Sequence, residues 1–374
     1  MPAGPTNEPA RETARAGPRV LAFTQGDPAG IGPETIVKYL SSRDLRLARW
    51  RPLVIAERAA LQMLEGSVPG DWRDRLVFFD APPLREELAG LADRALPVLD
   101  PVGGGRQVVP GVSGPADAAG AVAALDAGIE AVRSGLADAL VTAPVSKASI
   151  ARQHLPGFRG HTDYLAEASG LERYGRDYLM AFLASDLQVA LLTVHLPLAR
   201  ALQAVDRTSV LEALELLWRW VGGRIAVAGL NPHAGERGLL GEEEAAVLAP
   251  AVAAARERGI DAQGPESPDS VFARARRGAF DWVLSLYHDQ GLIAVKTAAF
   301  GAATNWTLGL PFLRTSVDHG TGFDLAGRGR ADAGPLARVV ETTLRLASGE
   351  LPRGARKDRP GLNPSTSLAE PGGG

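Results

Sequence analysis

The chain has 374 residues, of which 45% are hydrophobic and 22% are charged, and its formal net charge is -3. This composition indicates a globular protein large enough for two domains or lobes, and the weak negative charge argues against nucleic acid as a partner. The absence of cysteine excludes disulfides, thiolate metal sites and cysteine nucleophiles and favours a cytoplasmic location. No apolar run approaches the roughly 20 residues needed to cross a bilayer, so we expect no membrane partner.

The two ends of the chain differ in composition from the rest. Residues 1–18 and 351–374 are rich in Pro, Gly and polar residues, so we expect a disordered leader and a disordered tail. The leader also lacks the apolar region of a signal peptide.

The first expected strand, residues 19–25, runs into the glycine-rich turn GDPAGIGPE and then into a helix. Backbone N–H groups of such a turn can bind an anion at the helix N-terminus. The turn is neither GxGxxG nor a P-loop, and a tight structural turn is an equally good interpretation.

Strands and helices alternate along the chain. We expect strands at residues 51–57, 75–82 and 139–144, and helices at 119–138 and 209–221. We expect loop or extended structure, with flexible glycines (103–105), at 96–116. In the last helix, Ser209 and Glu212 form an expected capping box. The alternation predicts the α/β class with mostly parallel strands.

Three histidines stand at the ends of apolar strands, two of them directly and the third after Asn231 and Pro232. These are His195 after residues 189–194, His233 after residues 224–230, and His288 after residues 282–287. Ligands bind at the carboxyl ends of strands in open α/β sheets, and three neutral imidazoles suit a divalent cation such as Zn²⁺. The alternative is that each histidine only hydrogen-bonds a neighbouring loop, and no close HxxxH spacing decides between the two.

Several polar residues near these strand ends suit an anionic substrate. Lys296, Asn305 and Arg314 follow the third strand, and His161 and Thr162 lie in a polar loop before a helix. Arginine offers a bidentate fork and lysine a point charge to phosphate or carboxylate groups. Each of these residues could instead be a surface or helix-capping residue.

Six motifs occur in one order along residues 19–349: GDPAGIGPE, GHTDYLAE, TVHLPL, GLNPHAGE, YHDQGL and LGLPFLRTSVDHGTGFDLAGRG. In these motifs the chain resembles the 4-hydroxythreonine-4-phosphate dehydrogenase family of pyridoxal 5'-phosphate biosynthesis. The resemblance implies an isocitrate/isopropylmalate dehydrogenase-like α/β fold, with two α/β/α lobes and a central cleft. Residues 19–150 plus 312–350 would form the cofactor lobe, and residues 151–311 the metal, substrate and dimer lobe. It also implies a homodimer whose active site lies at the subunit interface.

The resemblance assigns roles to individual residues. It implies one divalent cation (Zn, Mg or Co) per subunit, bound by His195, His233 and His288. It implies that the phosphorylated substrate contacts His161, Thr162, Lys296, Asn305 and Arg314. It also implies NAD or NADP, with cofactor contacts at His319, Gly320, Asp324 and Gly327.

The general base is not identified by any motif. Lys147 lies just past the strand at 139–144, where a lysine can hold a phosphate, polarise an oxygen, or simply begin a surface helix. Asp289, next to His288, is the second candidate. Gln25, Ala143 and Ser146 depart from the commonest form of the family motifs, which leaves open the branch of the family.

The implied reaction oxidises 4-phosphooxy-L-threonine at C3 to 2-amino-3-oxo-4-phosphooxybutanoate, which loses CO₂ to give 3-amino-2-oxopropyl phosphate. The first alternative is a 4-phospho-D-threonate or 4-phospho-D-erythronate dehydrogenase of the same family, and a cis-dihydrodiol dicarboxylate dehydrogenase is more distant. A non-redox metal hydrolase or acyl-phosphate transferase is a further alternative. The residues singled out above do not decide between an amine and a hydroxyl at C2.

Overall fold

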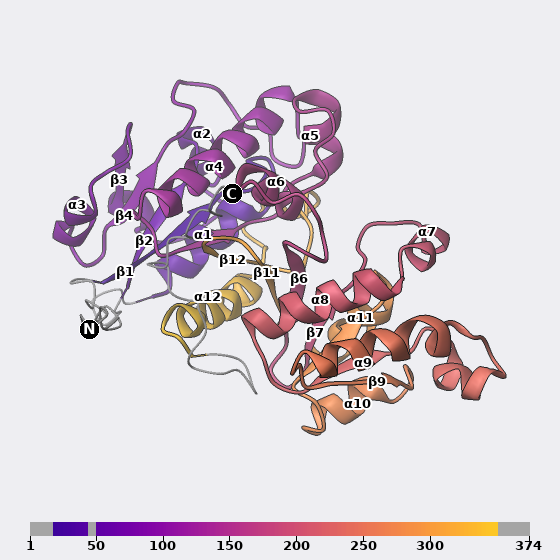
Figure 1. Ribbon diagram of the computed structural model, residues 1–374. Coiled ribbons are helices and arrows are strands. Elements are labelled where there is room, and N and C mark those ends of the chain that lie inside the picture. Colours follow the sequence, from indigo (N-terminus) through magenta and orange to yellow (C-terminus); the bar gives the residue numbers. More distant parts are fainter. Residues whose placement is uncertain (1–17, 44–49, 351–374) are drawn as a thin grey trace, which may run out of the picture.

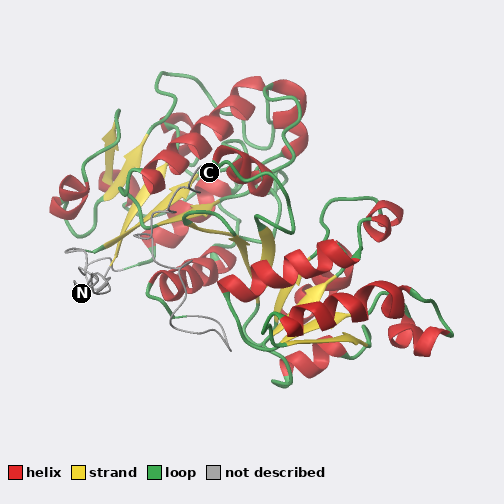
Figure 2. Cartoon of the chain, in the orientation of Figure 1, coloured by secondary structure: helices red, strands yellow, loops and turns green. Residues whose placement is uncertain are grey.

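The protein is described by a computed structural model for residues 18–43 and 50–350. The expected disordered leader (1–18, apart from Pro18) and tail (351–374) lie outside the described residues. Figures 1 and 2 show a mixed α/β fold in which helices surround a large twisted sheet. Within the described ranges, every helix is too short or too polar to cross a membrane.

The first half of the sheet is parallel throughout. Its order is β3 (Leu76–Phe79), β4 (Leu96–Leu99), β2 (Trp50–Ile55), β1 (Arg19–Thr24), β5 (Ala139–Thr142) and β12 (Leu313–Ser316). The expected strands at 19–25, 51–57, 75–82 and 139–144 are confirmed. In the segment at 96–116, expected to be loop or extended structure, residues 96–99 form the buried strand β4.

The second half of the sheet is mixed. Its order is β11 (Thr304–Leu308), β6 (Leu179–Leu183), β7 (Gln188–Leu191), β10 (Trp282–Ser285), β8 (Ile225–Ala228) and β9 (Ala262–Glu266). β11 is antiparallel to β12 and β6, and β6 is antiparallel to β7. β7, β10 and β8 are parallel neighbours. The prediction of mostly parallel strands, with the three histidine-bearing strand ends at one edge, is therefore confirmed.

Helices cover both faces of each half, so each half has α/β/α layers. On the first half, one face carries α1 (Gly32–Ser41), α2 (Arg58–Gln62) and α12 (Gly334–Ala347), and the other carries α3 (Arg85–Gly90), α4 (Pro115–Arg133) and α6 (His161–Ala168). On the second half, α8 (Arg207–Trp220) and α9 (Ala249–Glu257) lie opposite α10 (Val271–Arg276) and α11 (His288–Ala299). The shorter elements are α5 (Lys147–Gln153), α7 (Leu198–Gln203), η1 (Trp72–Arg75), η2 (Pro232–Gly238) and η3 (Glu244–Leu248).

The expected capping box at Ser209 and Glu212 is wrong, because the observed box lies three residues earlier, at Asp206 and Ser209. α8 starts with Asp206 as N-cap, whose carboxylate accepts a hydrogen bond from the Ser209 amide at 2.7 Å. The Ser209 hydroxyl in turn accepts from the Asp206 amide at 3.0 Å. Aspartate and serine are about equally good N-caps, and here the helix begins at the earlier one, so Ser209 becomes its third residue.

The glycine-rich turn after β1 is structural. Residues 26–32 are all buried, and a Cβ on Gly26 would lie 2.2 Å from the Pro144 carbonyl oxygen. Asp27 accepts hydrogen bonds from the Ala29 amide at 3.1 Å and the Ser113 hydroxyl at 2.8 Å. The turn is thus packed against the segment after β5.

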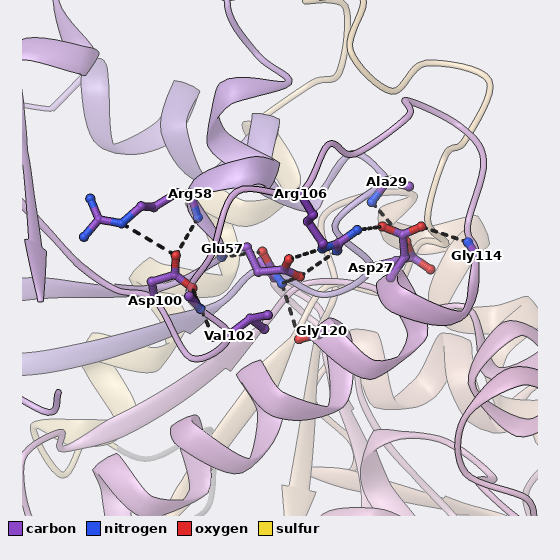
Figure 3. Close-up of polar contacts among 12 residues, drawn as sticks. Asp27, Ala29, Glu57, Arg58, Asp100, Val102, Arg106, Gly114 and Gly120 are labelled. Carbon is purple, nitrogen blue, oxygen red and sulfur yellow. Dashed lines mark hydrogen bonds and ion pairs between the residues drawn. The ribbon is translucent and has the colours of Figure 1, made fainter. Parts of the chain in front are cut away.

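A buried ion network lies beside this turn (Figure 3). Arg106 donates to both Glu57 oxygens, at 2.6 and 2.9 Å, and to Asp117 at 2.8 Å. Gly103 lies at positive φ on an exposed turn, and its amide donates to the Asp100 carboxylate at 2.9 Å. The network holds the loop at 100–114 against the first half of the sheet.

Candidate active site

A cavity of about 280 Å³ lies over the centre of the sheet, where the two halves meet. Its floor contains residues of β6, β11 and β12, and its walls come from the segment after β5, the starts of α6 and α11, and the segment after β12. The predicted site residues that line it are Lys147, His161, Thr162, His195, His288, Lys296, Asn305, Arg314, His319 and Gly320. The predicted residues outside its lining are His233, Asp289, Asp324 and Gly327.

Arg314 is the dominant charge of this cavity. It is 1% exposed, and its two terminal nitrogens donate to the hydroxyls of Thr307 at 3.0 Å and Thr142 at 2.6 Å. Its Nε has no partner among the described residues, and burial lowers its pKa to about 9. A buried guanidinium held only by neutral hydroxyls is a strong binding group for an anion, because the ligand supplies the missing countercharge.

The other polar groups of the cavity are arranged around this arginine. Asn305 is 8% exposed, and its side-chain oxygen has no partner in the described part of the chain. His161 begins α6, and burial lowers its pKa well below the ordinary value, with Arg314 and Lys147 lowering it further. The imidazole therefore stays neutral and can hydrogen-bond a ligand without charge.

Lys147 reaches the histidine side of the cavity. Its Nζ lies 3.1 Å from Nε2 of His195. A Cβ on Gly160 would lie 2.8 Å from Cε of Lys147, so a side chain at this position would displace the end of the lysine. Burial lowers the pKa of Lys147, as does Arg314, while Asp163 acts in the opposite direction.

Two of the three predicted metal-binding histidines come together. The ring centroids of His195 and His288 are 5.7 Å apart. Burial, Lys147 and His288 lower the pKa of His195, which favours the neutral imidazole that a metal requires. Nδ1 of His288 lies 2.7 Å from the Asp289 carboxylate, so its Nε2 is left for a ligand. These two side chains fit two positions around a divalent cation.

The third histidine points elsewhere. His233 lies in a left-handed segment (residues 233–237 all have positive φ), its side chain is 61% exposed, and Nδ1 is 2.8 Å from Glu236. Throughout residues 18–43 and 50–350, no group of three or more His, Cys, Asp or Glu side chains could hold a metal. The strand ends are adjacent as predicted, but the backbone turn after β8 carries His233 away from the other two.

Only two of the four predicted cofactor residues line the cavity, and Asp289 does not. The Asp289 side chain is 75% exposed and pairs with His288. His288 lines the cavity, but Asp289 does not. His319 and Gly320 line the cavity, whereas the exposed Asp324 and the half-buried Gly327 follow on a loop that packs against the turn after β1. That packing includes a 2.9 Å hydrogen bond from the Ile31 amide to the Thr321 carbonyl.

Sequence reasoning did not assign several polar residues of this site. Thr142 and Thr307 hold the arginine, and Asp163 and Asp318 are the carboxylates of the lining. Thr142 ends β5, and this position at a strand end was the available signal.

The comparisons with known proteins agree on one family. The family model described as pyridoxal phosphate biosynthetic protein PdxA matches residues 51–343. The 4-hydroxythreonine-4-phosphate dehydrogenase of Aromatoleum aromaticum is 42% identical over 329 residues, which cover 86% of this chain and 94% of that protein. The chain belongs to the PdxA family. Its family and its dehydrogenase class, predicted from the motifs, are confirmed, and the class implies a nicotinamide cofactor.

Solved structures support the PdxA fold. The crystal structure of the Klebsiella pneumoniae 4-hydroxythreonine-4-phosphate dehydrogenase is similar with a TM-score of 0.75 and 33% identity, covering 87% of this chain and 99% of that one. A terephthalate 1,2-cis-dihydrodiol dehydrogenase from Burkholderia xenovorans is similar at 0.56 and 25%, covering 87% and 97%. The PdxA architecture is therefore shared with a dehydrogenase that has a different substrate.

Proposed function

We propose that this chain oxidises 4-phosphooxy-L-threonine at C3, in pyridoxal 5'-phosphate biosynthesis. The product, 2-amino-3-oxo-4-phosphooxybutanoate, loses CO₂ and takes up a proton at C2 to give 3-amino-2-oxopropyl phosphate. The observation that carries this proposal is the buried Arg314, whose charge has no carboxylate partner among the described residues. A doubly anionic substrate supplies that partner.

The remaining substrate contacts follow from the cavity lining. Lys296 and Arg314 bind the phosphate and carboxylate groups, and His161, Thr162 and Asn305 orient them by hydrogen bonds. Fixing both ends of a short substrate holds C3 in one position, so binding energy lowers the entropic cost of reaching the reactive geometry. We assign the cavity to the cleft between a lobe of residues 19–150 plus 312–350 and a lobe of residues 151–311.

When bound, NAD or NADP supplies the hydride acceptor at the side of His319 and Gly320, and a divalent cation at His195 and His288 supplies a Lewis acid. Lys147 is the better candidate for the base, because it lines the cavity and its pKa is lowered by burial. A lysine with a lowered pKa can accept the proton of the C3 hydroxyl near neutral pH. Asp289 then serves to orient His288 through Nδ1.

We infer that the third metal ligand is His233 of a second copy of the chain, in a homodimer with the site at the subunit interface. The segments after His195 and His233 both project from the body of the molecule in Figure 1, where α7 marks the first. Both carry exposed leucines: Leu196, Leu198 and Leu202 on the first, Leu239 and Leu240 on the second. Apolar residues gathered beside an incomplete site suit a contact between subunits.

Subunit mixing tests this arrangement. His195→Ala and His233→Ala variants should each be inactive. When the two variants are unfolded together and refolded, about half of the dimers contain one chain of each, and one of the two sites in such a dimer is complete. The mixture should therefore regain about a quarter of the wild-type activity. A mixture of His195→Ala with His288→Ala is the control and should stay inactive, since both changes lie on the same side of the interface. Failure of the first mixture to recover activity would rule out the shared site.

The assay for the reaction itself is reduction of NAD⁺ or NADP⁺, followed by absorbance, with Zn²⁺, Mg²⁺ or Co²⁺ present. 4-Phosphooxy-L-threonine should be the preferred substrate over 4-phospho-D-threonate and 4-phospho-D-erythronate. Preference for a hydroxy acid would move the chain to the alternative branch of the family. Absence of nicotinamide reduction with all three would favour a metal hydrolase or acyl-phosphate transferase.

A further inference from the structure

The cavity that binds anions also contains two carboxylates, and they differ in their surroundings. Asp163 accepts a hydrogen bond from the Tyr178 hydroxyl at 2.9 Å and lies 3.9 Å from Arg159. It therefore has partners within the protein. Asp318 lies two residues beyond the end of β12 and lines the cavity half-buried.

Asp318 lacks such partners. No side chain in residues 18–43 or 50–350 donates a hydrogen bond to its carboxylate or forms an ion pair with it. Burial raises its pKa, and the more distant charges of Lys296 and His319, with its own backbone amide, only partly offset this. A partly desolvated carboxylate without a close cation is costly in the free protein, and a cationic ligand group removes the cost.

The proposed substrate has one cationic group. Its phosphate and carboxylate match Lys296 and Arg314, but the ammonium at C2 would be repelled by these cations and by Lys147. The ammonium needs a carboxylate in the same cavity, and Asp163 is already engaged. We propose that Asp318 binds the C2 ammonium group of the substrate and thereby selects an amino acid over a hydroxy acid. This inference rests on the proposed function.

The charge arrangement predicts opposite effects on the two substrate types. With Asp318 ionised, an ammonium at C2 gains a charge-assisted hydrogen bond, whereas a hydroxyl gains only a neutral one. Removing the negative charge makes the cavity more positive. The fully anionic hydroxy acid should then bind at least as well as before, while the amino acid should bind less well. Damage to the fold would weaken both.

The test compares Asp318→Asn with the wild-type protein, using 4-phosphooxy-L-threonine and 4-phospho-D-threonate. The variant keeps the shape and removes the charge. We expect kcat/KM for the amino acid to fall about 30- to 100-fold, mainly through KM, and kcat/KM for the hydroxy acid to stay the same or rise a few-fold. Without cofactor, the rise in Tm that the amino acid causes should be smaller in the variant than in the wild-type protein. The rise in Tm that the hydroxy acid causes should be unchanged or larger.

Asp163→Asn is the matched control, because it removes the other carboxylate of the cavity and should affect both substrates alike. Equal losses for both substrates in Asp318→Asn would overturn the inference, and so would a change confined to the KM of the nicotinamide cofactor. Wild-type protein that oxidises only the hydroxy acid would overturn the proposed function instead. Wild-type preference for the amino acid without a change of preference in the variant would overturn only the role of Asp318.

Discussion

Replacement of Arg314 by methionine should stabilise the free protein while impairing its function. The fall in the pKa of Arg314 from 12.5 to about 9 corresponds to a folding penalty on the order of 5 kcal/mol, as an upper bound. The folded state holds this proton less tightly than the unfolded chain, so the penalty is complete at any pH below about 9 and shrinks only above it. Because methionine loses the hydrogen bonds to Thr142 and Thr307, we expect a net gain of about 1–3 kcal/mol.

The same change should lower kcat/KM for the phosphorylated substrate by about 10²- to 10³-fold, because the ligand anion loses a buried charged partner. Urea denaturation at pH 7.5 measures the free energy of unfolding, and steady-state kinetics measure the loss of function. Arg338→Met, the same change at an exposed arginine, should alter neither quantity appreciably. A variant less stable than the wild-type protein, or one with an unchanged KM, would refute the view of Arg314 as an uncompensated anion-binding charge.

Three other changes have expected outcomes. When the pH falls from 7.5 to 5.0, the free energy of unfolding of the wild-type protein should drop by up to about 2 kcal/mol more than that of His161→Asn. The reason is that the pKa of the His161 imidazole lies well below 6.5 in the folded protein, so only the unfolded chain gains a proton. Urea denaturation at the two pH values measures both changes, and an equal change in the two proteins would contradict this. Arg106→Met removes the only cation that pairs with Glu57 and Asp117 among the described residues, although Glu57 keeps its bond from Gln25 and Asp117 its bond from Gly114. The change should cost about 3–5 kcal/mol in urea denaturation, with partial rescue by adding Glu57→Gln. A cost no larger than for a surface arginine would show that the network is solvated. Thr142→Val removes a hydrogen-bond acceptor of the buried Arg314 and should raise the substrate KM about tenfold. An unaltered KM would show that Thr142 has no role in substrate binding.

Local sequence patterns predicted much of the first half of the fold. Apolar runs identified β1, β2, β3 and β5, and the same signal placed β7, β8 and β10 before their histidines. Sequence reasoning did not assign β11 and β12, although at five and four residues they are no shorter than β5, β8 and β10, and β12 carries the buried Arg314. A short strand with a charged residue has no distinctive period, so its assignment depends on the neighbours with which it pairs.

The sequence by itself determined the family, the class of reaction and the inventory of polar side chains, because each motif is a local run of residues around a strand end. Tertiary structure decided which of these residues meet. It brought Lys147 to within 3.1 Å of His195 and enclosed Arg314 between Thr142 and Thr307. It also left His233 outside the cavity that His195 and His288 line, on a segment after β8 whose residues 233–237 all have positive φ. Sequence spacing does not encode such distances, since they depend on sheet order, strand twist and backbone torsions that are set only when the whole chain packs.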